Sequence, residues 1–255
     1  MKILNSQQIG KGETNIVILH GFLGMGDNWK SFAKRLDGQK FKINLVDQRN
    51  HGKSFWDDSM SYVDMATDLL MFCNSQNIHK TIIIGHSMGG KTAMKFSSMF
   101  PERVEKLIVV DIAPKKYSPD FKNIIDGYNH LDLDSFNSRA EIDNVYKIFV
   151  EDNSLRSFLM KNIHRDKEGK FRLRINLKVL EKKITEIGSF DHENLFFNKS
   201  TVFIKGSKSD YILENDENLI KKCFPKSFLH KVHNAGHWVH NDKPEVFEKI
   251  VKSII

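Results

Sequence analysis

The chain has 255 residues, of which 40% are apolar and 28% are charged, and its formal net charge is +7. This balance is ordinary for a globular protein with one large buried core, and no stretch approaches the roughly 18–20 apolar residues of a membrane span. Lysines are interspersed with acidic residues, and no zinc-finger spacing or RNA-binding aromatic signature occurs. We therefore expect no nucleic-acid partner and no stable membrane insertion.

Strand and helix patterns alternate along most of the chain. Strands are predicted at residues 16–19, 43–46, 81–84 and 106–112, and helices at residues 27–36, 61–74 and 89–100. The same pattern resumes near the C-terminus with strands at residues 201–204 and 228–232 and a helix at 244–255. Such alternation predicts an α/β fold, in which helices flank both faces of a mostly parallel twisted sheet.

The rhythm is interrupted in the middle of the chain. Residues 114–190 are rich in charge and helical in tendency, show no clear strand, and include one amphipathic helical pattern over residues 155–163. We predict a core formed by residues 1–113 and 191–255, with residues 114–190 inserted as a helical cap or lid. Such a cap would cover the carboxyl edge of the sheet, where open α/β sheets bind ligands.

The pentapeptide Gly85-His86-Ser87-Met88-Gly89 carries the sharpest chemical signal. It follows an apolar strand and precedes a helical pattern, which is the context of a nucleophile elbow. Glycines flank the serine there because the turn is tight. The alternative is a glycine-rich turn whose serine merely caps the next helix. We predict that Ser87 is a catalytic nucleophile, which needs a base to accept its proton.

A second glycine-rich segment, residues 20–24 (HGFLG), directly follows the first strong strand. In hydrolases with such an elbow, this loop lies beside the serine. We expect the backbone N–H groups of Phe22 and Met88 to form an oxyanion hole. The alternative is a simple strand-to-helix connection. Leu23 and His86 are expected to border the substrate.

The base is expected just after the last strand, in residues 234–238 (NAGHW). His237 follows the serine in chain order, as this kind of fold requires, and the adjacent Trp238 is a candidate for lining the acyl pocket. His233, His237 and His240 could also be read as a metal cluster. Because they lie in a predicted loop without a paired carboxylate or cysteine, we expect neither a metal nor an organic cofactor.

Two aspartates compete for the role of the acid that orients the histidine. Asp111 ends the strand next to the one that carries Ser87, so its carboxylate would emerge at the same edge. Asp210 lies in the loop after the next strand, residues 206–210 (GSKSD), where many hydrolases place their acid. Arg49, in residues 49–52 (RNHG), is expected either to contact an acidic substrate group or to buttress the oxyanion loop.

Five segments taken together, HGFLGMGDNW, VDQRNHGKS, IGHSMGGKTAM, VDIAP and NAGHWVH, resemble the YbfF-type esterases and their mitochondrial abhydrolase relatives in the α/β-hydrolase superfamily. The resemblance covers about residues 15–113 and 200–255. It places the family's nucleophile on Ser87, its base on His237 and its acid on Asp111, and it implies a non-acidic residue at Ser209. The resemblance implies hydrolysis of acyl esters, and acyl-CoA thioesters are among the possible substrates.

The leading hypothesis is therefore a serine hydrolase that cleaves carboxylic esters or thioesters of small molecules through an acyl-enzyme. One alternative is carbon–carbon bond hydrolysis or perhydrolysis on the same fold, and another is a non-catalytic ligand-binding homologue. Residues 1–8 lack the apolar core of a secretory signal, and Cys73 and Cys223 show no metal or redox spacing. A cytoplasmic location is expected, while the sequence leaves open a monomer or a dimer.

Overall fold

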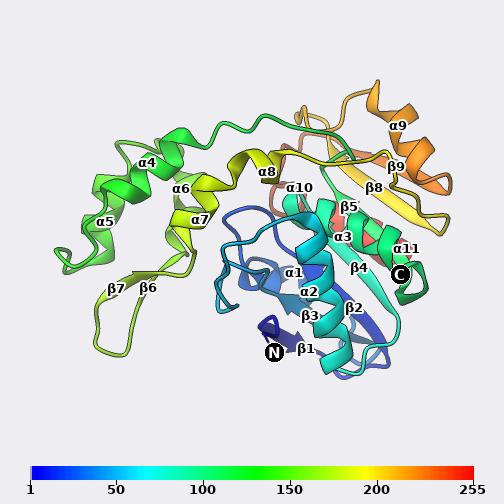
Figure 1. The fold of residues 1–255 in the computed structure, drawn as a ribbon, viewed down its shortest axis with the longest axis horizontal. Helices are drawn as coiled ribbons and strands as arrows, with labels where there is room; N and C mark the ends of the chain where they lie inside the picture. Colours follow the sequence, from blue (N-terminus) through cyan, green and yellow to red (C-terminus); the bar gives the residue numbers. More distant parts are fainter. Residues whose placement is uncertain (1) are drawn as a thin grey trace.

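The computed structural model describes residues 2–255 and is built around one seven-stranded sheet (Figure 1). The strand order is β1-β3-β2-β4-β5-β8-β9, and every neighbouring pair is parallel except β1 with β3. The strands are β1 (Ser6–Ile9), β2 (Thr14–Leu19), β3 (Phe41–Val46), β4 (Thr81–His86), β5 (Val104–Val110), β8 (Thr201–Gly206) and β9 (Ser227–Val232). The predicted α/β architecture with a mostly parallel sheet is confirmed.

Helices cover both faces of this sheet. Along β4, Ile83 belongs to the core cluster under α2, α3 and α9, whereas Ile82 and Ile84 belong to the cluster under α1, α10 and α11. The bounds are α1 (Lys30–Ala33), α2 (Tyr62–Ser75), α3 (Met88–Met99), α9 (Asp216–Cys223), α10 (Val239–Asp242) and α11 (Pro244–Ile254). Because both faces are buried, the central strands are continuous apolar runs rather than alternating ones.

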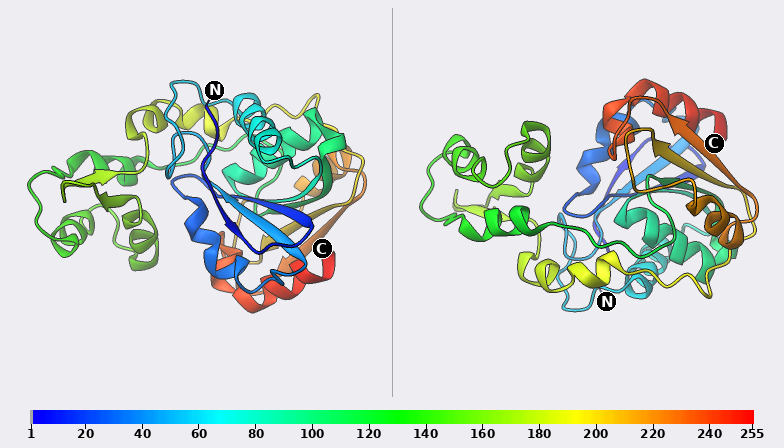
Figure 2. Two further views of the ribbon diagram at one scale, coloured as in Figure 1. Left: turned by 90° about the horizontal axis from the view of Figure 1, so that it is seen from below. Right: turned by 90° about the horizontal axis from the view of Figure 1, so that it is seen from above.

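The segment between β5 and β8 forms a separate layer, and we call its residues 114–190 the cap. Figures 1 and 2 show that part of this segment projects well beyond one end of the sheet. Its elements are α4 (Lys122–His130), α5 (Arg139–Tyr146), α6 (Asn153–Met160), β6 (Ile163–Arg165), β7 (Phe171–Leu173), α7 (Leu177–Lys182) and α8 (Ile184–Gly188). Treating the cap and the core as two domains stays a prediction.

Two details of the cap differ from the sequence prediction. The expectation of no strand is wrong, because β6 and β7 pair as an antiparallel hairpin. Each strand has only three residues, which is too short to show the alternation that identifies a strand. The predicted amphipathic helix corresponds to α6, which ends at Met160, so that Ile163 begins the hairpin instead.

Elements of the core also depart from the prediction. The helix expected at residues 27–36 is a 3₁₀ turn, Gly26–Trp29, followed by the single-turn α1, and another 3₁₀ turn covers Pro101–Arg103. Strand β1 escapes prediction because its sequence, SQQI, is mostly polar and it lies at the sheet edge. Within residues 2–255, the helices are too short or too polar to cross a bilayer.

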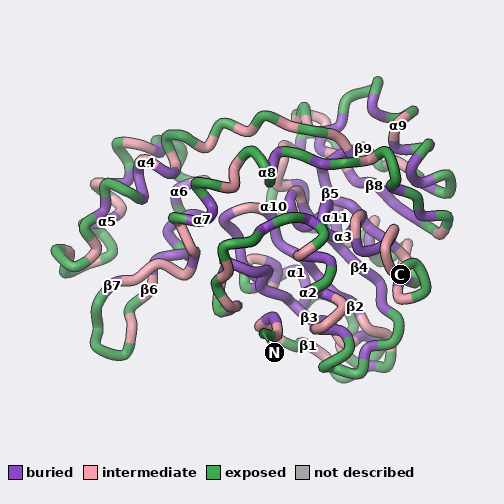
Figure 3. The backbone as a smooth tube through the Cα atoms, viewed as in Figure 1, coloured by how far each residue is buried: buried purple, intermediate pink, exposed green. Residues whose placement is uncertain are grey.

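Buried contacts hold the cap against the core near the carboxyl ends of the strands. The Tyr62 hydroxyl donates to the carbonyl oxygen of Ile187 at 2.6 Å, and the backbone N–H of Asn176 donates to Asn50 at 3.0 Å. Figure 3 shows the contrast between the buried central strands and the exposed outer surface of the cap. The cap is therefore anchored to the start of α2 and to the segment that joins β3 to α2.

Candidate active site

Ser87 lies in the tight turn between β4 and α3. Its backbone has φ +52° and ψ −119°, a conformation that L-residues rarely adopt and that is typical of functional strain. A Cβ added at Gly85 would lie 2.3 Å from the carbonyl oxygen of Gly89, and one added at Gly89 would lie 2.4 Å from that of Leu19. Only glycine fits at both positions, so the pentapeptide permits the sharp turn that presents the Ser87 side chain.

His237 and Asp111 meet at the same edge of the sheet. Asp111 directly follows β5 with φ +52°, its side chain is fully buried, and His237 lies in the loop after β9. The Nδ1 atom of His237 lies 2.8 Å from Oδ2 of Asp111. The carboxylate also accepts hydrogen bonds from the Gly206 N–H at 3.0 Å and from the Ser209 hydroxyl. These contacts fix the imidazole and assign its Nδ1 as the donor, because an ionised carboxylate only accepts.

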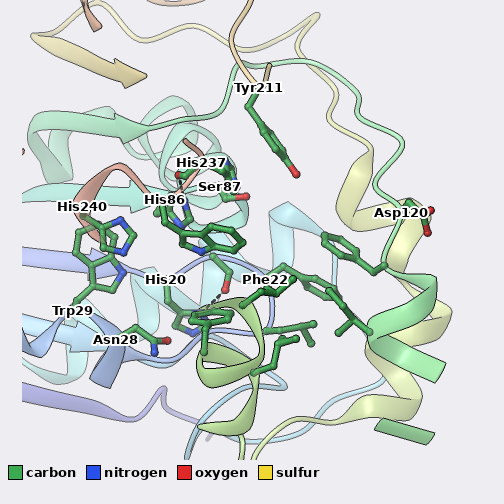
Figure 4. Close-up of a pocket in the computed structure, with 18 residues that line it drawn as sticks. His20, Phe22, Asn28, Trp29, His86, Ser87, Asp120, Tyr211, His237 and His240 are labelled. Carbon is green, nitrogen blue, oxygen red and sulfur yellow. Dashed lines mark hydrogen bonds between the residues drawn. The ribbon is translucent and has the colours of Figure 1, made fainter. Parts of the chain in front are cut away.

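Ser87 and His237 line one cavity of about 220 Å³ beneath the cap, and Figure 4 shows their side chains close together. The Tyr211 ring stacks on the His237 imidazole with ring centres 3.8 Å apart. His86 Nε2 donates to the backbone oxygen of His237 at 2.9 Å. In the described residues, no hydrogen bond joins Ser87 to His237, although both side chains line the same cavity.

The second candidate acid lies elsewhere. Asp210 is exposed in the loop after β8, whereas the neighbouring Ser209 points its hydroxyl at Asp111. The carboxylate that reaches His237 is therefore that of Asp111. The structure brings together Ser87, His237 and Asp111, and it leaves Asp210 in solvent.

The glycine-rich loop of residues 20–24 lies against the elbow. A Cβ added at Gly21 would lie 3.4 Å from the Cβ of Ser87. Over residues 2–255, neither the Phe22 N–H nor the Met88 N–H has a hydrogen-bond acceptor. Two free donors thus flank the serine, and such a pair can bind a developing oxyanion.

Leu23 is the strained residue of this loop, with φ +58°. Its N–H donates to His51 Nε2 at 3.2 Å, and its carbonyl oxygen accepts from the Asn162 side chain at 2.8 Å. Asn162 is fully buried and comes from the cap. The loop is therefore held from two sides, by the core and by the cap.

Two neutral histidines, His20 and His51, join the loop of residues 20–24 to residues 48–51. Burial lowers the pKa of His20 to about 4 and that of His51 to about 3, so both act as hydrogen-bonding imidazoles near pH 7. His20 Nε2 accepts from the Gln48 N–H at 3.0 Å, and His51 Nδ1 donates to the Arg49 carbonyl at 2.9 Å. This part of the loop at residues 49–52 buttresses residues 20–24.

The cavity wall contains most of the residues expected to contact substrate. Phe22, Leu23, His86 and Trp238 all line it. Arg49 does not, because its guanidinium forms a two-pronged ion pair with Asp68 at 2.6 and 2.9 Å. The alternative in which Arg49 contacts an acidic substrate group does not fit this geometry, because the Asp68 carboxylate already binds the guanidinium through both oxygens.

Sequence reasoning passed over Lys91 and Asn162. Lys91 is only 2% exposed, and burial lowers its pKa to about 7. It lies one helical turn after Ser87, on the buried face of the predicted helix, where small or apolar residues are expected. A lysine at such a position was the signal in the sequence that could have identified it. Asn162 gave no signal, because its partner Leu23 is 139 residues away in the sequence.

The histidines near the C-terminus have different surroundings. His240 stacks on Trp29 with ring centres 3.9 Å apart, and His233 is exposed. Burial lowers the pKa of His240 to about 3. In the part of the chain that the structure describes, no group of three or more His, Cys, Asp or Glu side chains has the arrangement of a metal site.

Comparisons with known proteins agree with this architecture. The family model described as "alpha/beta hydrolase fold" matches residues 14–244. Esterase YbfF of Escherichia coli is 30% identical, with 99% of this chain and 98% of that protein covered. The sn-1-specific diacylglycerol lipase ABHD11 of Danio rerio is 34% identical, with 96% of this chain and 79% of that protein covered.

A solved structure called "Marine microorganism esterase" is similar over its full length. It is 40% identical in sequence, superposes with a TM-score of 0.94, and covers 100% of both chains. The family match covers residues 14–244, and Esterase YbfF is similar over nearly the whole length of both chains. The chain therefore belongs to the α/β-hydrolase fold family, in the group that includes Esterase YbfF.

Proposed function

We propose that this protein hydrolyses carboxylic esters, with Ser87 as the nucleophile, His237 as the base and Asp111 as the acid that orients it. One observation carries the proposal: the 2.8 Å contact between His237 Nδ1 and Asp111 Oδ2 holds the imidazole in the cavity that Ser87 also lines. Relatives that share most of the chain's length are named esterases or lipases, which supports an ester as the substrate class.

The first half of the proposed reaction forms an acyl-enzyme. Because the Nδ1–H of His237 donates a hydrogen bond to Asp111, the Nε2 atom of His237 is free to accept the proton of Ser87. The serine oxygen attacks the ester carbonyl, and the resulting oxyanion accepts hydrogen bonds from the N–H groups of Phe22 and Met88. His237 then donates its proton to the leaving alcohol, and the bond between the carbonyl carbon and the leaving oxygen breaks.

The second half releases the acid. Water takes the place of the alcohol beside His237, which removes a proton from it as it attacks the acyl-enzyme. Collapse of the second tetrahedral intermediate returns the proton to Ser87 and frees the carboxylic acid. A thioester would react by the same steps with a thiol as the leaving group, so acyl thioesters are included in the proposed substrate class.

Steady-state hydrolysis of p-nitrophenyl acetate and butyrate tests the proposal. We expect the wild type to turn over both esters and Ser87→Ala to lose at least about 10⁴-fold in kcat. A dienol diketone assayed in parallel tests carbon–carbon bond hydrolysis, and we expect no turnover of it. Undiminished ester hydrolysis by Ser87→Ala would refute the role of Ser87, and a well-folded wild type without esterase activity would refute the proposed reaction.

A further inference from the structure

Two cavities meet at Ser87. The larger one, about 220 Å³, opens under the cap, and the smaller one, about 30 Å³, is a slot on the other side of the serine. Phe22, Phe121 and Tyr211 border both cavities, so they form the partition around the serine. An ester bound with its carbonyl at Ser87 can therefore direct its two arms into different cavities.

The position of His237 decides which arm enters which cavity, an argument that rests on the proposed function. His237 borders the larger cavity and is not among the residues that line the slot. The general acid must reach the oxygen of the leaving group, because it protonates that atom as the ester bond breaks. The leaving group therefore belongs in the larger cavity, and the acyl group belongs in the slot.

Lys91 forms part of the wall of the slot, one helical turn after Ser87 along α3. Its ammonium donates to the carbonyl oxygen of Gly188 at 2.8 Å, and it lies 3.4 Å from those of Ile187 and Ser189. The Tyr62 hydroxyl shares the Ile187 oxygen at 2.6 Å. These bonds hold both Lys91 and this stretch of the cap in place, so this wall of the slot is fixed rather than mobile.

The surroundings of Lys91 also make it a poor gate for an apolar chain. Within residues 2–255 no carboxylate forms an ion pair with Lys91, and its amino group contacts the backbone oxygens and the faces of Tyr62, Tyr117 and Phe190. Moving the side chain aside would separate its buried amino group from all three acceptor oxygens, which is costly, although the Gly188 oxygen would keep the Tyr117 N–H and the Ile187 oxygen would keep the Tyr62 hydroxyl. A long acyl chain cannot displace it cheaply.

We propose that Lys91 limits the acyl group to a short chain, from acetyl to about butyryl, while a bulkier alcohol or thiol occupies the larger cavity. A single water needs about 10–15 Å³ of such space, so a slot of about 30 Å³ holds two or three non-hydrogen atoms beyond the carbonyl. On the other side, Leu155, Phe158 and Trp238 also border an adjoining cavity of about 460 Å³. The space available to the leaving group is therefore many times larger.

Acyl-chain selectivity tests the proposal. We would measure kcat/KM for p-nitrophenyl acetate, butyrate, octanoate and laurate, which share a leaving group. For the wild type we expect kcat/KM to fall at least tenfold between butyrate and octanoate. Lys91→Ala should open the slot and raise the ratio of octanoate to acetate at least tenfold. Lys91→Met has a side chain one atom shorter that cannot donate to the cap, so it should raise the ratio less than Lys91→Ala does. The matched control Lys95→Ala, one turn further along α3, should retain the wild-type ratio.

The outcomes separate this proposal from the proposed reaction. Wild-type kcat/KM for octanoate or laurate equal to or above that for butyrate would overturn the short-acyl limit, even if Lys91→Ala fails to fold. A folded Lys91→Ala variant with an unchanged ratio would overturn the role of Lys91. Labelling of Ser87 by a fluorophosphonate is read out separately: its absence, together with no turnover of any ester, would refute the reaction and this proposal with it.

Discussion

Asp111→Asn is the substitution for which the structure makes the most detailed forecast. The carboxylate accepts from the Gly206 N–H through one oxygen and from His237 through the other. An asparagine keeps only one acceptor, and the Gly206 N–H needs it. The amide NH₂ would then face His237 Nδ1, which must become an acceptor, so the ring proton moves to Nε2. That nitrogen could no longer accept the proton of Ser87.

The magnitude follows from this change of tautomer. In a well-studied serine protease, the corresponding substitution lowers kcat by about 10⁴-fold with the geometry intact. At about 1.36 kcal/mol for each factor of ten, this corresponds to about 5.5 kcal/mol of transition-state stabilisation. We expect a loss of about 10³–10⁴ in kcat for Asp111→Asn, with the fold retained, because the side-chain volume hardly changes.

The assay is kcat for p-nitrophenyl acetate at pH 8, alongside the thermal unfolding midpoint of each variant. Asp210→Asn is the matched control, since Asp210 is exposed and makes no contact with His237. We expect it to stay within about twofold of the wild type, as do most substitutions at exposed sites. A folded Asp111→Asn variant with more than a tenth of the wild-type kcat, or an inactive Asp210→Asn, would refute the assignment.

Three further changes follow from the geometry. Gly89→Ala should destabilise the folded protein by about 3 kcal/mol, because the added Cβ would lie 2.4 Å from a carbonyl oxygen at the end of β2. The unfolding midpoint should therefore fall by about 6–12 °C, and an unchanged melting curve would contradict this. The folded pKa values of His20 and His51, about 4 and about 3, lie below the ordinary value of 6.5, so the unfolded chain binds more protons as pH falls from 6.5 to 4. Stability should therefore decrease over that window, less steeply in His51→Gln, and equal midpoints at pH 7 and pH 4 would speak against it. Asn162→Ala should reduce kcat about tenfold or more with KM within about twofold, because Leu23 loses its hydrogen bond from the cap; steady-state kinetics would show it, and a wild-type kcat would exclude this role.

Much of the core was accessible from the sequence for a physical reason. Parallel strands buried on both faces appear as short apolar runs, so β2, β4 and β8 were predictable from the order of the residues. The pentapeptide at residues 85–89 was informative because a tight turn leaves no room for side chains at two of its positions. The order of serine and histidine along the chain then located the candidate base.

The remainder depended on contacts between distant residues. The three-residue strands β6 and β7 have no detectable period, and β1 is polar because it lies at an edge. The sequence could not choose between Asp111 and Asp210 by residue type, since the choice depends on which side chain reaches His237 in space. Lys91 was overlooked because a lysine is expected in solvent, whereas three backbone oxygens of the cap surround this one.

Intact-protein mass spectrometry after reaction with a fluorophosphonate ester tests the central claim most directly. The account predicts one adduct per chain, mapped by peptide digestion to Ser87, and no adduct in Ser87→Ala under the same conditions. A folded wild type that takes up no label, or an adduct that maps to any other residue and persists in Ser87→Ala, would contradict the account.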